Sequence, residues 1–324
     1  MTQTGQAGED KKNMSMKFGR AYCEALDGFV SPYRAREIYT DEDHEHYGKE
    51  LTFGCEDPGC RARLTPVGIY MVRKSKRALH FRTKEEHKAG CELVKPGDGG
   101  KVRKPSERED DYKPTNFPTE LDLNPPRRKG NGGSDDGGSE GDEGAGGRSS
   151  GGYSGADKRK TNSRTRYLDL VVDCFLSGDE DGKSGNLTIA GKTKPFGRFF
   201  KKVQYFGDEA GLIYYGLIDG LKIYNGKKGI GLRFADSVWV EKRPYRIWAH
   251  ISQEVIDDSR RKKSFLAEIA ELKKAVDGKE DVVAFFVGAH PAKTPVELKG
   301  GATFDLYSVE LSSVNHLSLA FARA

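Results

Sequence analysis

The stretch LIYYGLIDGLKIYNGKKGIGLRF, residues 212–234, decides the fold of the C-terminal half of this 324-residue chain. Residues 212–218 and 221–224 are rich in β-branched and aromatic side chains, which favour strands. The glycine-containing segment NGKKG at 225–229 is typical of a turn, and apolar residues then alternate over 230–234. The stretch therefore predicts strands that return on each other as a hairpin.

The pattern continues beyond this hairpin. Apolar residues alternate again over 245–251, and they recur at helical spacing within 257–276. These patterns predict a further strand followed by one long helix. We also expect a continuous apolar strand at 282–287, a final pair of strands around 304–309 and 314–321, and a helix at 167–176 that packs outside the barrel.

This order of strands around one helix, with glycines at bends, is the layout of a five-stranded barrel. The segments YYGLIDGLKIY (214–224), VVAFFVGAHPAK (282–293) and FDLYSVELSSVNHLSL (304–319) resemble the first and last strands of oligonucleotide/oligosaccharide-binding (OB) barrels. We expect a mainly β protein with an OB-like β-barrel domain and one or two helices. An unrelated small barrel or an α+β sandwich is the structural alternative.

Charge and aromatic content suggest a ligand for this domain. Residues 192–246 hold twelve basic and five acidic residues, with aromatic side chains between them. Proteins that bind single strands combine a basic groove with aromatic platforms. The candidate nucleic-acid contacts are Arg198, Lys201, Lys202, Lys222, Tyr224, Lys227, Lys228, Arg233, Arg243, Arg246 and Trp248.

One strand sharpens this prediction. Alternation along 245–251 places Arg246, Trp248 and His250 on the face opposite Ile247. If Ile247 lines the core, Trp248 is exposed beside Arg246, which favours a binding face. The alternative is that the aromatic residues are core and that the basic residues form an ordinary barrel surface.

Composition divides the chain. Residues 96–160 are rich in glycine, proline and charge, and GNGGSDDGGSEGDEGAGGRSSGG (130–152) lacks the apolar surface that a folded segment needs. Residues 116–123 carry three apolar side chains between prolines, and they are either plain linker or a peptide that docks on a domain. We predict a disordered tail at 1–15, a small module at 16–95, a flexible, disordered linker at 96–160 and the barrel domain at 161–324.

A possible metal site lies in the small module. Cys55 and Cys60 form a C-x4-C pair, and His87 and Cys91 form an H-x3-C pair further along the chain. Two short-range pairs that fold back on each other supply the Cys3His shell of a tetrahedral zinc ion. Such a shell has no open position, so we expect structural Zn²⁺ that contributes to folding. His80 is the substitute ligand if His87 is not used.

The order YCEALDGFV (22–30), the Cys55–Cys60 pair and the HFRT segment (80–83) is similar to the zinc-finger N-terminal region of competence-protein (CoiA-type) families. In those families a strand pair precedes a cysteine pair and an HF motif. Here the cysteines are spaced x4 rather than x2, and Arg82 and Thr83 follow HF in place of a second His. A nuclease-like domain often follows that finger, but we find no convincing Asp…Glu-x-Lys array in this sequence.

The small module has its own basic segment. Residues 61–88 hold nine Lys or Arg against two acidic residues, which suits a phosphate-facing surface or, alternatively, a solvated hairpin tip. The candidate nucleic-acid contacts in this segment are Arg73, Lys74, Lys76 and Arg77.

Several classes of protein are disfavoured. The sequence lacks a P-loop, a G-x-S-x-G motif and an H-E-x-x-H motif. Five cysteines in a long chain argue against a secreted disulfide framework, and no apolar run approaches the length of a membrane span. We expect a soluble, cytoplasmic protein with no small-molecule cofactor.

The sequence thus predicts a non-catalytic nucleic-acid-binding protein, with single-stranded DNA or RNA favoured as the partner. Two alternatives stay open. The first is a scaffold or subunit of a larger complex whose barrel binds a protein. The second is a divergent nuclease.

Overall fold

The computed structural model describes residues 17–72, 78–83, 85, 87–88, 91, 117–124, 164–207, 209, 211–224, 229–297 and 303–321. Strands dominate these residues, so the predicted mainly β class is confirmed. The predicted tail 1–15 and most of the predicted linker 96–160 lie outside them. Within the described chain, no helix has the length and apolar character needed to cross a membrane.

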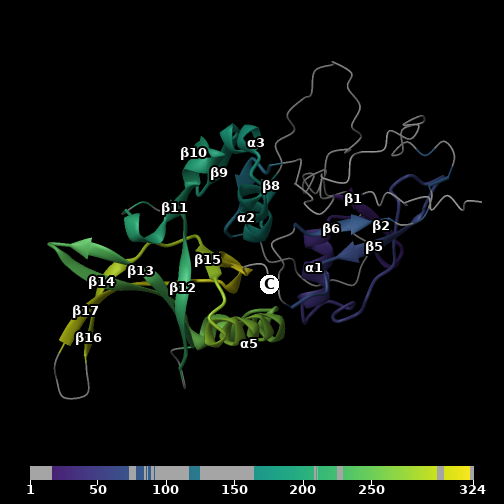
Figure 1. Ribbon diagram of the computed structural model, residues 1–324. Helices are drawn as coiled ribbons and strands as arrows, with labels where there is room; N and C mark the ends of the chain where they lie inside the picture. Colours follow the sequence, from purple (N-terminus) through teal and green to yellow (C-terminus); the bar gives the residue numbers. More distant parts are fainter. Residues whose placement is uncertain are drawn as a thin grey trace, which may run out of the picture.

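A curled eight-stranded sheet forms the centre of the C-terminal half (Figure 1). Its first three strands are β12 (Ile213–Ile223), β13 (Ile230–Val240) and β14 (Arg243–Ile251). They pair as antiparallel neighbours, with Leu221 opposite Leu232 and Leu232 opposite Ala249. The predicted hairpin is therefore confirmed, and its alternating apolar side chains are buried on one face.

Two helices follow these strands. Helix α4 (Gln253–Asp257) is short, and α5 (Lys262–Asp277) carries the predicted helical pattern, with Phe265, Ile269 and Leu272 buried against the sheet. Figure 1 shows α5 beside the end of β12.

The strands after α5 differ from the predicted pattern. They are β15 (Val282–Phe286), β16 (Ala292–Glu297), β17 (Thr303–Glu310) and β18 (Leu317–Phe321). Strand β16 was not predicted, and it forms a hairpin with β17. The two strands expected as a final pair are β17 and β18, and they do not pair with each other. Strand β17 runs parallel to β14, whereas β18 runs antiparallel to β15.

This arrangement curls the sheet. Strand β15 pairs antiparallel with β12 on the side away from β13. The chain leaves β17, which lies beside β14, and crosses the sheet to form β18 beside β15. The short 3-10 helix η5 (Val314–His316) interrupts this passage, while Leu311, Val314 and Leu317 stay buried along it. The result is a curled, half-barrel sheet.

A small four-stranded sheet lies in the order β10 (Lys192–Pro195), β9 (Asn186–Ile189), β7 (Glu120–Leu121) and β8 (Arg164–Thr165). Strand β7 belongs to the segment whose role the sequence left open. Leu121 is 3 % exposed, and the ring of Phe117 packs edge-on against Phe196 at 4.8 Å between centroids. Residues 117–124 therefore dock as part of the C-terminal core.

The remaining elements of this half are α2 (Leu168–Leu176), α3 (Glu180–Ser184), the 3-10 helices η2 (Phe196–Phe199) and η3 (Val203–Tyr205), and β11 (Phe200–Lys202). Helix α2 confirms the helix predicted at 167–176. It packs outside the curled sheet, since Phe175 stacks on Phe200 with ring centroids 3.7 Å apart. Strand β11 pairs with the beginning of β12.

The N-terminal half forms a six-stranded sheet in the order β1 (Lys17–Phe18), β6 (His80–Arg82), β5 (Arg63–Val67), β4 (Phe53–Gly54), β2 (Ala21–Cys23) and β3 (Gly28–Val30). The 3-10 helix η1 (Glu24–Leu26) joins β2 to β3, and α1 (Pro32–Thr40) follows β3. Phe53 and Phe81 pack at 4.7 Å in a core distinct from that of the C-terminal half. Ser31 caps α1 by accepting a hydrogen bond from the Arg34 N–H.

Helix α1 joins this module to the C-terminal half. Arg36 donates a hydrogen bond to Glu268 of α5 at 3.0 Å, and the Tyr33 hydroxyl donates to Asp173 of α2 at 2.6 Å. The Glu42 carboxylate accepts the Lys263 N–H at 2.6 Å, at the start of α5. The two halves are therefore in direct contact through buried and part-buried polar groups.

Candidate metal centre and outer sheet face

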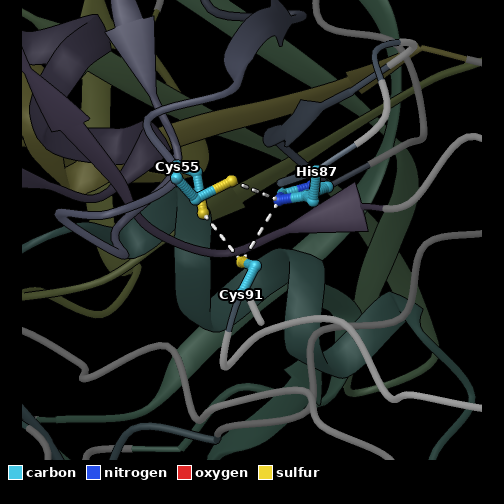
Figure 2. A group of neighbouring side chains, drawn as sticks. Cys55, His87 and Cys91 are labelled. Atoms are coloured by element: carbon cyan, nitrogen blue, oxygen red, sulfur yellow. Dashed lines mark hydrogen bonds between the residues drawn. The ribbon is translucent and has the colours of Figure 1, made fainter. Parts of the chain in front are cut away.

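Cys55, Cys60, His87 and Cys91 converge on one point of the N-terminal module. Their ligand atoms all lie within 4.8 Å of one another, and Figure 2 shows Cys55, His87 and Cys91 directed toward a common centre. The sulfur atoms of Cys55 and Cys91 are 3.7 Å apart, and all cysteines of the described chain are free thiols. The predicted pairing of the C-x4-C and H-x3-C segments is what brings the group together, and such a group can hold a metal ion.

Local backbone contacts shape the first pair. Cys55 follows β4 directly and donates its N–H to the Ala62 carbonyl at 2.8 Å. Between the two cysteines, the Gly59 N–H donates to the Asp57 side chain and the Cys60 N–H donates to the Asp57 carbonyl. The x4 spacing is thus accommodated by a tight turn that returns Cys60 beside Cys55.

The second pair is held by the same kind of contact. The Cys91 N–H donates to the Lys88 carbonyl at 3.1 Å, which places Cys91 one turn after His87. The Lys88 N–H points to the sulfur of Cys60 at 3.4 Å. Backbone N–H groups directed at sulfur favour the thiolate, the form that binds metals.

The electrostatics suit a cation. Burial raises the pKa of the Cys55 thiol to about 12. Burial also acts to raise the pKa of Cys60, but hydrogen bonds from the backbone at Ala62 and Lys88 and from neighbouring thiols outweigh it and lower that pKa. Burial lowers the pKa of His87, which keeps the imidazole neutral. Three thiolates cannot share this space without a positive charge to offset them.

Nδ1 is the His87 nitrogen that faces the cysteines. It lies 3.3 Å from the Cys60 sulfur and 3.4 Å from the Cys91 sulfur. His80, the predicted substitute, lies outside the group, and its Nδ1 is 2.9 Å from the Ala78 carbonyl oxygen. Cys23 is buried in the module core and is likewise outside the group.

The candidate nucleic-acid residues divide into two sets. Ile247 is buried, so Arg246, Trp248 and His250 occupy the outer face of β14, as the alternation predicts. The strand register adds neighbours, because Trp248 lies opposite Arg233 and His250 lies opposite Gly231, which faces Lys222. We call this surface the outer face and define it by Lys222, Tyr224, Gly231, Arg233, Arg246, Trp248 and His250.

Aromatic rings and cations alternate on the outer face. Trp248 and His250 are nearly parallel, with an interplanar angle of 8° and centroids 5.8 Å apart. The Arg233 guanidinium lies 6.0 Å from the Trp248 ring, and the Lys222 ammonium lies 4.9 Å from the Tyr224 ring. A Cβ at Gly231 would meet the His250 ring at 2.9 Å, so glycine is what lets that ring lie low over the sheet.

Sequence reasoning missed an acidic residue on this surface. Asp219 accepts a hydrogen bond from Nε of Arg233 at 2.7 Å, and its carboxylate also lies 3.8 Å from Arg246. The bulge in β12 between Ile218 and Gly220 places this side chain there. No local sequence pattern predicts that bulge. The position of the Asp219 carboxylate beside the two arginines therefore could not be predicted.

The other candidates lie elsewhere. Arg198 belongs to η2, and Lys201 and Lys202 belong to β11, which pairs with the opposite end of β12 from the outer face. Arg243 lies at the tip of the β13–β14 hairpin. The structure therefore does not bring these four residues onto the outer face. Arg73, Lys74, Lys76, Arg77, Lys227 and Lys228 lie outside the described residues.

Neither a scan against protein-family models nor a search of curated proteins found a match to this chain.

Proposed function

We propose that this protein binds single-stranded nucleic acid on the outer face, and that a structural zinc ion at the Cys3His group holds the N-terminal module folded. The stack of Trp248 on His250, flanked by Arg233 and Arg246, carries the first part of the proposal. The resemblance of the C-terminal sequence to OB barrels agrees with it.

The chemistry of the outer face supports a single strand over a duplex. Stacking on Trp248 needs a base whose ring face is free, and bases inside a duplex are already stacked on each other. Lys222, Arg233 and Arg246 provide cations for phosphates, and Arg246 is 56 % exposed. Cations on this surface make the affinity depend on salt, because bound phosphates release their counterions.

The metal proposal rests on donor chemistry and spacing. Three thiolates and an imidazole are a ligand set that zinc prefers. Around a tetrahedral zinc with bonds of ~2.3 Å, two sulfur atoms lie ~3.8 Å apart. Cys55 and Cys91 have their sulfurs at 3.7 Å. All four positions are filled by protein atoms, so such an ion is structural and does not activate a substrate.

Fluorescence anisotropy on the full chain tests the binding proposal. A labelled single-stranded ~20-mer and its duplex are titrated across a salt series. We expect micromolar or tighter binding to the single strand that weakens steeply with salt. The full chain is needed because Phe117 and Leu121, which precede the predicted domain, are part of the C-terminal core.

A matched pair of variants locates the site. Trp248→Ala should weaken binding, whereas Tyr205→Ala should not. Tyr205 is an exposed aromatic on η3, which packs on the inner side of the sheet through Val203 and the neighbouring Phe206–Tyr307 contact. No binding by the wild-type chain at low salt would reject the proposal and turn the search to protein partners.

A further inference from the structure

Besides Trp248, the chain has a tryptophan at position 239, which is exposed near the end of β13. The chain has two tryptophans in all. Trp239 keeps 69 % of its surface exposed, more than Tyr205 or Ile223. The indole has a large apolar ring face, and its burial against a flat partner is favourable because it removes that face from water.

The strand register places Trp239 on the same side of the sheet as the outer face. Trp239 lies opposite Pro244 in the antiparallel β13–β14 pair, and Ser237 lies opposite Arg246. Along β14, Pro244, Arg246 and Trp248 alternate onto one face. The register shift between Arg233 and Ser237 sets four positions of β13 against two of β14, and this even difference keeps both residues on that face. Both tryptophans therefore face the same way.

The arm that carries Trp239 is a hairpin closed by a tight turn. β13 and β14 are joined by two residues, Glu241 and Lys242, whose φ angles of 48° and 66° are those of a tight hairpin turn. Figure 1 shows the two strands running outward together from β12. Arg246 is 56 % exposed and lies between Pro244 and Trp248 on the same face, so a cation stands between the two tryptophans.

We propose that Trp239 is a second stacking position for the same single strand, so that the strand follows β14 from His250 toward the hairpin tip. This inference rests on the proposed function. Trp248 lies four positions after Pro244, the partner of Trp239, which corresponds to about 13 Å of strand. A ligand must therefore span that length to reach both tryptophans, and a dinucleotide reaches only one.

Single-tryptophan variants test this directly, since the ring that stacks is also the fluorophore. In Trp248→Phe the emission comes from Trp239, and in Trp239→Phe it comes from Trp248. We expect a ~12-mer of oligothymidylate to quench both variants, whereas a dinucleotide should not quench both. Quenching of Trp248 with no change at Trp239 overturns the inference and leaves the proposed function standing.

Affinity gives an independent reading. Trp239→Ala should weaken binding of the ~12-mer about 5- to 150-fold, the change that one lost stack produces. Tyr205→Ala is the matched control and should have no effect. Trp239 is exposed, so its replacement should leave the thermal unfolding midpoint unchanged. Wild-type affinity in Trp239→Ala overturns the inference alone, and absence of wild-type binding overturns both proposals.

Discussion

The guanidinium of Arg36 in α1 lies 3.0 Å from the carboxylate of Glu268 in α5, across 232 residues of sequence. Arg36 is 5 % exposed, and it also donates to backbone carbonyls at Gly68 and Met71. One side chain thus holds a loop of the N-terminal module and a helix of the C-terminal half. The module is positioned by this contact as well as by the chain that joins the halves.

We predict that Glu268→Ala destabilises the docked form by about 3–5 kcal/mol, because it leaves the buried Arg36 without its carboxylate. Arg261 shares that carboxylate and loses it as well. Denaturant unfolding of the full chain measures the change. Lys273→Ala is the control, since it breaks an exposed pair with Asp277 on the same helix and should stay close to wild type. Equal effects in the two variants would contradict a role for the buried pair.

Acid should weaken the same interface through Glu37. Burial acts to raise the pKa of Glu37, but Arg34, Arg166 and a hydrogen bond from Tyr167 outweigh it and lower that pKa. A carboxyl whose folded-state pKa is depressed stabilises the fold above its ordinary pKa of about 4.3, and that contribution is lost as pH falls through the folded value. We expect stability to fall with acid in this window. Glu37→Gln should be less stable at neutral pH and should flatten the dependence, and an unchanged slope would contradict the assignment.

Metal removal should unfold the N-terminal module and spare the C-terminal half, because the two halves have separate cores. Elemental analysis should find one zinc per chain in the wild type and none in Cys91→Ala. Limited proteolysis should then cut Cys91→Ala, or the wild type after chelation, within residues 17–91. Cys23→Ala is the matched control, since Cys23 is a buried thiol outside the metal group. It should keep the metal, and loss of metal in both variants would point to general unfolding.

The sequence predicted what short-range spacing determines. The two ligand pairs are each only a few residues long, so their spacing alone implied the metal group. The hairpin was equally visible, because its alternation and its turn are local. The contact between Arg36 and Glu268 could not be predicted, because the sequence of each helix does not indicate which of its faces packs against the other helix. Strands β17 and β18 were found, but their partners were misjudged because pairing across the sheet depends on β14 and β15, which are distant in sequence.

Leu121 tests whether the peptide at 117–124 is part of the fold. Strand β7 lies between β8 and β9, and Leu121 is buried in the C-terminal core. Leu121→Ala should cost about 2–5 kcal/mol, the range for truncating a buried leucine. Leu123→Ala is the control, because Leu123 is only partly buried against that core and should lose less. Thermal unfolding measures both, and a wild-type midpoint for Leu121→Ala would show that the peptide is dispensable.

The last prediction has the opposite sign to the others and concerns Asp219. This carboxylate is hydrogen-bonded to Arg233 and lies 3.8 Å from Arg246, so it offsets the two arginine charges of the outer face. Asp219→Asn should therefore tighten binding of a single strand and steepen its salt dependence, because both guanidinium groups become available to phosphates. Asp236→Asn makes the same change of net charge from the neighbouring strand, outside this group of three side chains. If both variants gain equally, the effect is one of net charge alone. A larger gain for Asp219→Asn assigns the phosphate contacts to Arg233 and Arg246.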